Sequence, residues 1–206
     1  MKISYAQAIN KALKEEMARN KNLVCFGLGV NDSLRFFGTT KGLKEKFGEQ
    51  RVFETPTSEN AMTGIGIGMS LYKNPCVMMH QRLDFFLLAM DQLVNSAAKW
   101  HYMFGGKKSV PITIRLVVGK GWGQGPTHSQ SLQSWFAHIP GLKVVMPTFP
   151  SDAYNLLKKS IRDPNPVIFI EHRWLHNIEQ EIKKIKFTNK KNSTELISKG
   201  KDFTAV

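Results

Sequence analysis

Glu59 and His128 are the two side chains whose chemical type and sequence context best suit proton transfer. Glu59 lies in TPTSENAMTG (55–64), after a strand-like run and a proline turn, where small residues open a helix. Its neighbours are small or apolar, so we expect a partly buried carboxyl, which can donate a proton as well as accept one. The simpler alternative is an acidic residue that stabilises a helix N-terminus by ~0.3–1 kcal/mol.

His128 lies in GPTHSQS, between a glycine-rich loop and the next expected helix. The simpler interpretation is that Ser129 caps that helix and the histidine is incidental.

Among the other histidines, only His172 and His176 have helical i, i+4 spacing. We interpret that pair as a surface or interface feature rather than a metal site. No GxSxG motif marks a nucleophilic serine.

Two glycine-rich stretches resemble phosphate-binding loops but lack the required spacing. Neither GIGIGMS (64–70) nor GKGWGQG (119–125) matches GxGxxG, and neither is followed by GK[ST]. We interpret the first as a packing feature, in which Gly64 and Gly68 let a neighbouring backbone approach a helix. The second is expected to be a mobile loop that lines a site.

Short apolar runs that alternate with helix-like segments predict the fold. The expected strands are residues 22–27, 51–55, 75–80, 111–119, 142–147 and 166–172. The expected helices are residues 4–19, 41–48, 59–72, 85–103, 129–138 and 150–162. Because the strands are almost continuously apolar, the predicted class is α/β, a doubly wound, mainly parallel sheet with helices on both faces. Ligands bind beyond the carboxyl ends of such strands, which places Glu59, the 80–85 turn and the 119–128 loop on one rim.

Composition is that of a globular protein of 206 residues, with 42% apolar residues and a formal net charge of +13. Seven lysines fall between Lys183 and Lys201, and the others are scattered, so we interpret the charge as a solvated surface rather than a nucleic-acid site. No run is apolar and long enough to span a membrane. The two cysteines, Cys25 and Cys76, suggest no disulfide framework, which favours a cytoplasmic, reducing compartment.

Several longer stretches together resemble a known family. GLGVNDSLRFFGTTKGLKEKFGEQRVFETPTSENAMTGIGIGMS, DFFLLAMDQLVNSAAKWHYMFGG, THSQSLQSWFAHIPGLKVVMP and SIRDPNPVIFIEH occur in order over roughly residues 4–176. As a set they resemble the beta subunit of the thiamine-diphosphate-dependent first component of 2-oxoacid dehydrogenase complexes. The resemblance implies a transketolase-like pyrimidine-binding domain, which takes part in oxidative decarboxylation of a 2-oxo acid and acyl transfer to lipoyl.

The resemblance also implies roles for four side chains. Glu59 matches the glutamate that hydrogen-bonds the aminopyrimidine ring of thiamine diphosphate and so activates the cofactor. Phe85 matches the aromatic residue that stacks on this ring, and Gln81 matches a neighbouring position in the same pocket. His128 matches a histidine that supplies protons during acyl transfer.

Metal ions and partner chains are implied by the resemblance as well. A potassium ion would be held mostly by backbone carbonyl groups, around Ile112, Ser160, Ile161, Asp163 and Asn165. That segment could equally be an unoccupied helix-to-strand turn. The GDG signature that holds magnesium and diphosphate is absent from this sequence. The resemblance therefore implies an alpha subunit that supplies it, a second beta subunit in a heterotetramer, and a lipoyl acyltransferase partner.

Three domain segments are expected: a pyrimidine-binding domain over 1–176, a lysine-rich linker over 177–200, and the start of a second domain over 201–206. Two alternatives stay open, a split transketolase subunit that transfers ketol groups and a truncated assembly module without catalytic activity. The sequence departs from the family pattern at His80, Arg82 and the bulky Trp122. We therefore expect a pocket of altered polarity, whose substrate need not be pyruvate or a branched-chain acid.

Overall fold

The computed structural model describes residues 2–32, 34 and 36–181 of the chain. Its centre is a six-stranded sheet in the order β3-β2-β4-β5-β7-β6, in which every neighbouring pair is parallel. The strands are β2 (Val24–Gly27), β3 (Val52–Glu54), β4 (Cys76–His80), β5 (Ile112–Val118), β6 (Lys143–Val145) and β7 (Val167–His172). The predicted α/β, doubly wound, parallel fold is therefore confirmed.

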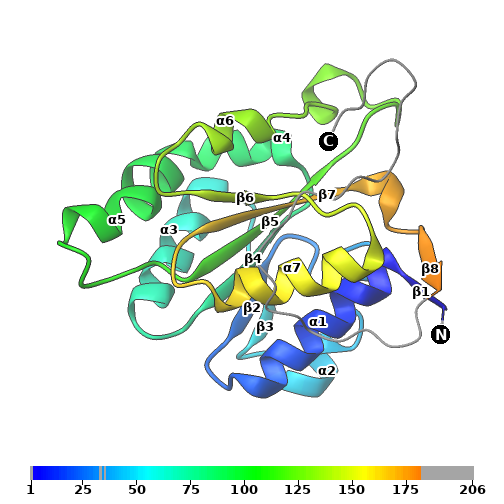
Figure 1. Cartoon of the computed structure of the whole chain (residues 1–206), viewed down its shortest axis with the longest axis horizontal. Coiled ribbons are helices and arrows are strands. Elements are labelled where there is room, and N and C mark those ends of the chain that lie inside the picture. Colours follow the sequence, from blue (N-terminus) through cyan, green and yellow to red (C-terminus); the bar gives the residue numbers. More distant parts are fainter. Residues whose placement is uncertain (1, 33, 35, 182–206) are drawn as a thin grey trace, which may run out of the picture.

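Helices cover both faces of this sheet (Figure 1). α1 (Tyr5–Arg19) and α7 (Pro150–Arg162) cover one face, and α3 (Glu59–Leu71) covers the other. Side chains of β4 alternate between the two cores: Val77 and Met79 pack on the side of α1 and α7, whereas Met78 packs on the side of α3. Because both strand faces are buried, the strands must be apolar throughout, as their sequences are.

The long helix predicted over 85–103 is present but irregular. It is built from α4 (Leu83–Phe86), the 3₁₀ turn η1 (Leu87–Ala89), the π-helical η2 (Gln92–Ala97) and α5 (Ala98–Met103). Ala89, Leu93 and Ala97 are buried on one side of it, as the helical periodicity predicts. Such π-helical turns are frequent near functional sites.

Two local predictions are wrong. The helix expected over 129–138 is replaced by η3 (Pro126–His128) and a short α6 (Gln133–Ala137), because Asp84 accepts the backbone N–H of Gln130 and holds the intervening residues out of helical geometry. Gly64 and Gly68 are exposed. The close approach occurs at Gly66, where an added Cβ would lie 2.9 Å from Ile112 Cδ1 and 3.0 Å from Phe26 Cζ.

A short antiparallel pair joins the two ends of the described chain. β1 (Lys2–Ser4) pairs with β8 (Glu179–Glu181), with Ile3 opposite Gln180. Sequence periodicity does not identify either strand, because three residues are too few to show alternation.

The remaining helix is α2 (Leu43–Phe47), and η4 (Arg173–Leu175) precedes β8. From residue 182 on, the predicted linker and second domain lie outside the described residues.

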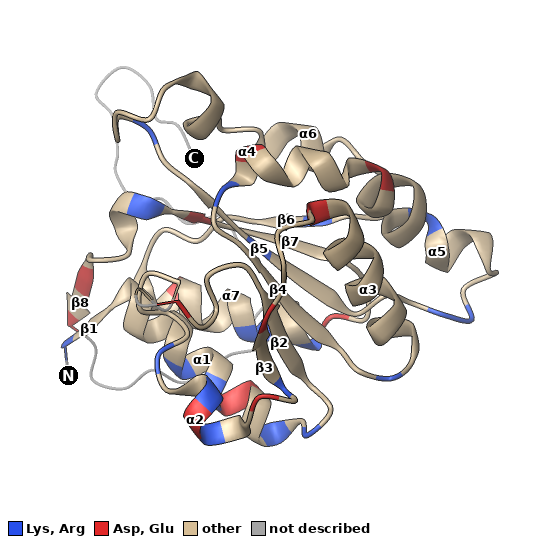
Figure 2. Cartoon of the chain, turned by 180° about the vertical axis from the view of Figure 1, so that it is seen from behind, with Lys and Arg blue, Asp and Glu red and all other residues tan. Residues whose placement is uncertain are grey.

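Charge is distributed over many elements of the molecule. Figure 2 shows lysine and arginine positions on helices, strand ends and loops of both layers rather than on a single face. Over the described residues, no helix is long and apolar enough to cross a membrane.

A buried ion pair lies between two central strands, on the side of the sheet covered by α1 and α7. Arg115 on β5 and Glu171 on β7 have fully buried side chains, and Arg115 Nε lies 2.5 Å from Glu171 Oε1. Arg115 Nη2 donates to Glu171 Oε2 (2.9 Å) and to Thr39 Oγ1 (2.9 Å). His176 Nε2 lies 3.0 Å from the same Glu171 oxygen. One cluster thus ties β5 and β7 to the loop after β2 and to the segment after β7.

The interpretation of His172 and His176 as a surface or interface pair needs correction. His176 is buried and bonded to Glu171, so its interpretation as a surface residue is wrong, while His172 is half-buried. Burial by itself would raise the pKa of Glu171, but the charge of Arg115 and the hydrogen bonds from His176 and Arg115 lower it to about 2. Glu171 is therefore a carboxylate in the folded protein.

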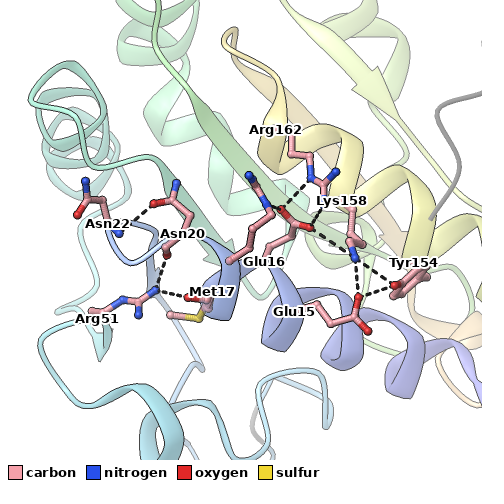
Figure 3. Close-up of polar contacts among 10 residues, drawn as sticks. Glu15, Glu16, Met17, Asn20, Asn22, Arg51, Tyr154, Lys158 and Arg162 are labelled. Atoms are coloured by element: carbon pink, nitrogen blue, oxygen red, sulfur yellow. Dashed lines mark hydrogen bonds and ion pairs between the residues drawn. The ribbon is translucent and has the colours of Figure 1, made fainter. Parts of the chain in front are cut away.

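A second polar cluster joins α1 to α7 (Figure 3). Lys158 Nζ and the Tyr154 hydroxyl each lie 2.5 Å from Glu15 Oε2. Glu16, whose side chain is fully buried, accepts hydrogen bonds from Arg162 and from Arg19. These contacts fix the separation of the two helices that cover one face of the sheet.

The C-terminus of α1 is held by a separate contact, from Arg51 (Figure 3). Arg51 Nη2 donates to the carbonyl oxygens of Met17 and Asn20, both at 2.8 Å. These carbonyl groups lie at the helix end, where no further helical N–H is available to them. Arg51 therefore takes the place of a helix cap.

We expect Arg115→Met to lower the free energy of unfolding by about 3–5 kcal/mol, because it leaves the Glu171 carboxylate buried without its main counter-charge. The double variant Arg115→Met/Glu171→Leu should be less destabilised than the single variant, since no charge is left unpaired. Thr39→Val is a milder probe, with an expected loss of about 1–3 kcal/mol. Urea unfolding followed by circular dichroism measures all three. A loss below 1 kcal/mol for Arg115→Met would contradict the proposed weight of this pair.

Stability should fall as the pH is lowered from about 4.5 toward about 2. The pKa of Glu171 and that of Glu15 are each lowered from 4.5 to about 2 in the folded protein. The unfolded chain therefore takes up protons first, and the stabilisation present above pH 4.5 is lost as the pH falls. In Glu15→Gln the slope of unfolding free energy against pH should be smaller over this range. Glu49→Gln, at a side chain that is 79% exposed, is the control and should keep the wild-type slope.

Candidate active site

The carboxyl ends of all six parallel strands meet at one edge of the sheet. From β2 the chain passes to β3 on one side, and β4 then pairs with β2 on its other side, so the strand order reverses between β2 and β4. A crevice forms at such a reversal because the loops diverge on either side of it. The predicted site residues Glu59, Gln81, Phe85 and His128 all follow strands at this edge.

Glu59 is the first residue of α3, and it is buried, with 8% of its surface exposed. Ser58 before it makes no side-chain cap, and within the described residues the Glu59 carboxylate has no hydrogen-bond or ion-pair partner. Its backbone carbonyl accepts a hydrogen bond from Thr63 Oγ1 (2.8 Å), which holds the first turn. The oxygens of this carboxylate are not among the fully buried side-chain atoms that lack a hydrogen bond, so Glu59 is enclosed while its carboxyl end stays open to a ligand.

Phe85 and His128 lie together although they come from different elements. The Phe85 ring on α4 meets the His128 ring at the end of η3 edge to face, with centroids 5.1 Å apart and planes at 88°. Phe85 is 40% exposed, so part of its surface is open to a ligand. Thr127 Oγ1 lies 3.2 Å from His128 Nδ1, which leaves Nε2 as the ring nitrogen without a contact in the described part of the chain.

Gln81 lies directly after β4 and connects it to the loop after β2. Its Nε2 donates to Asp32 Oδ2 (3.1 Å), and the same amide fills the space beside Gly29 that a side chain at that position would need. Glu54, at the end of β3, accepts the backbone N–H groups of Gly29 (2.5 Å) and Asn31 (2.8 Å). Glu54 and Asp32 were not identified from the sequence. An acidic residue that ends a buried strand was the available signal for Glu54.

Arg82 is held on the same rim by the 119–125 loop. Its guanidinium lies 4.2 Å from the Trp122 ring centroid, and the Trp122 indole N–H donates to the His128 carbonyl oxygen (2.8 Å). Nη2 donates to Gln124 Oε1 (3.0 Å), and Nη1 donates to the Gln81 carbonyl (3.0 Å). The Arg82 side chain therefore bridges the segments that carry Gln81 and His128.

His80 lies beneath this rim and is almost fully buried. Its ring meets Phe86 edge to face at 4.9 Å, and its Nε2 has no partner within the described residues. Burial lowers its pKa to about 4, so the imidazole is neutral near pH 7. The departures noted at His80, Arg82 and Trp122 thus lie next to the predicted site residues.

The residues predicted to hold potassium lie at the opposite edge of the sheet. Ile112 opens β5, and Ser160, Ile161, Asp163 and Asn165 lie at the end of α7 and in the turn before β7. The Asp163 carboxylate forms an ion pair with Lys143 and accepts the N–H of Asn165 (2.9 Å). No cluster of three or more metal-ligating His, Cys, Asp or Glu side chains occurs in the described part of the chain.

The rim suits a flat heteroaromatic ring such as the aminopyrimidine of thiamine diphosphate. The ring needs a hydrogen-bonding carboxyl and an apolar stacking face. Glu59 offers a carboxylate without a partner in the described residues, and Phe85 offers a partly exposed aromatic ring.

Curated relatives resemble this chain over nearly its whole length. It is 38% identical over 205 residues to the 2-oxoisovalerate dehydrogenase subunit beta of Bacillus subtilis, covering 99% of this chain and 63% of the relative. It is also 38% identical to a Cupriavidus necator acetoin:2,6-dichlorophenolindophenol oxidoreductase subunit beta (100% and 63% covered). A pyruvate dehydrogenase E1 component subunit beta of Rhizobium meliloti is 38% identical as well (97% and 44% covered). The chain thus spans less than two-thirds of the length of these relatives.

A solved structure shares the fold. A protein described as a split gene transketolase, an inactive beta4 tetramer, matches with a TM-score of 0.66 at 19% identity, covering 83% of this chain and 52% of that chain. At this identity the likeness concerns the fold alone. The family described as the pyrimidine binding domain of transketolase matches residues 1–177. This chain therefore belongs to the transketolase pyrimidine-binding domain family.

Proposed function

We propose that this chain is the pyrimidine-binding part of the beta subunit of a thiamine-diphosphate-dependent 2-oxoacid dehydrogenase. The observation that carries the proposal is Glu59, a largely buried residue that opens α3 at the ligand edge of the sheet and whose carboxylate has no partner among the described residues. The family and the identities to beta subunits of such enzymes support it. The relatives differ in their named substrates, so the choice of 2-oxo acid rests on this chain's own pocket.

Each rim residue has a role that follows from its setting. Glu59 holds a proton between its carboxyl oxygen and a ring nitrogen of the cofactor, and burial strengthens that hydrogen bond. Phe85 offers a stacking face, and Gln81 fixes the wall of the pocket through Asp32. Thiamine diphosphate, when bound, supplies the nucleophilic carbon and the electron sink that decarboxylation requires. His128 is proposed to deliver protons when the acyl group leaves for lipoyl.

Partner chains complete the proposal. An alpha subunit would supply the magnesium and diphosphate groups, and the same enzyme would contain a second beta subunit and meet a lipoyl acyltransferase. Support comes from large apolar side chains exposed on and near α3: Ile65 (55%), Tyr72 (82%) and Leu88 (66%). Such residues are normally covered when they gather on one surface. The cysteines Cys25 and Cys76 are free and buried, which fits the proposed cytoplasmic, reducing compartment.

A potassium ion near the end of α7 remains part of the proposal. Asp163 and Ile161 line an open cavity of 470 Å³ at the edge of the sheet opposite to Glu59. Its lining also includes Arg19, Lys73, Lys107, Lys108 and Arg162, so the cavity itself does not favour a cation and the proposal rests on backbone carbonyl groups. The Ser160 carbonyl already accepts the N–H of Asp163 (3.1 Å), and a carbonyl oxygen has a second lone pair for an ion. Any ion there would act on stability rather than on the chemistry.

Glu59→Gln should lower 2-oxo acid decarboxylation by roughly 10²–10⁴-fold in the enzyme reconstituted with its alpha subunit, because the amide cannot exchange a proton with the ring. Circular dichroism and the unfolding midpoint should stay near those of the wild type. Ser58→Ala is the matched control, since Ser58 is exposed and makes no side-chain cap. If Glu59→Gln turned over substrate at a near-normal rate, the residue would be only a helix-terminal charge.

His128→Ala should separate the two halves of the reaction. We expect decarboxylation with an artificial electron acceptor to persist, while acyl transfer to a lipoyl domain falls by roughly 10²-fold or more. The two assays are run on the same reconstituted preparation. Equal losses in both would show that His128 does not serve the transfer step in particular.

A further inference from the structure

Arg82 is the charged group on the rim that the proposed chemistry does not use. Its guanidinium plane is fixed by Trp122 at 4.2 Å, and its two hydrogen bonds within the described residues go to neutral oxygens, those of Gln81 and Gln124. Its Nε is buried and has no partner within the described residues. A buried donor on a charged group is costly when unpaired, so this nitrogen is poised for an acceptor.

One edge of the guanidinium, formed by Nε and Nη2, has a single partner among the described residues, the Gln124 side-chain oxygen. Nε and Nη2 form one fork of an arginine, and Gln124, which bonds Nη2, is an exposed residue of the 119–125 loop. A carboxylate or phosphate can bridge both nitrogens and replace the single amide oxygen. Gly121, Gly123 and Gly125 have φ values of +77°, +73° and +79°, a backbone form that lets this loop stay compact beside the guanidinium.

Two charged neighbours act on Arg82 in opposite directions. Burial lowers the pKa of Arg82 most, the Asp84 carboxylate raises it, and the charge of Arg173 lowers it to a smaller extent. The Asp84 carboxylate is already bonded to Gln130 through the backbone N–H (3.2 Å) and the side-chain amide (2.9 Å). Among the described residues, no carboxylate forms an ion pair with Arg82. The Arg82 guanidinium therefore has no directly bonded counter-charge among the described residues.

We propose that Arg82, held by Trp122, forms a subsite for a second anionic group of the substrate, a carboxylate or phosphate monoester at the end remote from the reacting carbons. This inference rests on the proposed function. Tight binding of the carboxylate that is lost as carbon dioxide would stabilise the ground state and oppose reaction. Binding of a remote group instead stabilises the ground state and the transition state equally, so it does not oppose the chemical step. The substrate class is thus a 2-oxo acid that carries a second anionic group.

The kinetic test compares substrates matched in length, 2-oxoglutarate with 2-oxopentanoate and 3-phosphohydroxypyruvate with hydroxypyruvate, on the reconstituted enzyme. In the wild type, kcat/KM should favour the dianionic member of at least one pair by tenfold or more. Arg82→Gln should reduce that preference at least tenfold, mainly through KM, and Arg82→Lys should restore part of it. Lys108→Gln is the charge-matched control, because Lys108 is an exposed residue ahead of β5, at the opposite edge of the sheet.

The carboxylate and phosphate pairs distinguish the two kinds of anion. A wild type without preference for either dianion would overturn the inference. Equal loss on both members of each pair in Arg82→Gln would also overturn it, because Arg82 would then only position the His128 loop.

A binding measurement keeps the inference separate from the proposed function. Malonate and inorganic phosphate are titrated into the full chain, and tryptophan fluorescence is followed with Trp122→Phe as the blank. A saturable change that is lost in Arg82→Gln supports the subsite even if no 2-oxo acid is turned over. A flat wild-type titration with both anions would overturn the subsite, whatever the activity assays show.

Discussion

The buried pair of Arg115 and Glu171 is the interaction on which the site edge of the sheet depends. It joins two central strands at their carboxyl halves, and through Thr39 and His176 it also anchors the loop after β2 and the segment after β7. Both charges are fully buried, so each offsets the cost of burying the other. The scaffold of the rim is therefore specified by electrostatics as well as by apolar packing.

The rim itself is assembled from short polar links between loops. Glu54 bonds two backbone N–H groups of the loop after β2, Gln81 reaches Asp32 in that loop, and Trp122 connects Arg82 to the His128 carbonyl. Each link joins segments that leave different strands. These links hold the loops beside Glu59 and Phe85, which lie on helices α3 and α4.

The sheet and most helices could be predicted because their signals are local. Apolar runs such as PCVMMH and PVIFIEH are buried on both faces, and the helical spacing of Ile9, Leu13 and Met17 matches the buried side of α1. The wrong predictions have non-local causes. Asp84 holds residues 129–131 out of a helix, Gly66 rather than its neighbours meets the sheet, and His176 is drawn inside by Glu171.

By itself the sequence determined the fold class, the edge at which a ligand would bind, and the candidate residues Glu59, Phe85 and His128, because strand and helix periodicity and family likeness are carried by residue order. Only the tertiary structure decided that the Glu59 carboxylate has no partner in the described residues, that Phe85 and His128 touch, and that Arg82 lies on Trp122 with no acidic partner. Those facts depend on which side chains from distant segments come within bonding distance. Hydrophobic periodicity places a strand but does not specify such pairs, because each one is set by the packing of loops that the pattern does not describe.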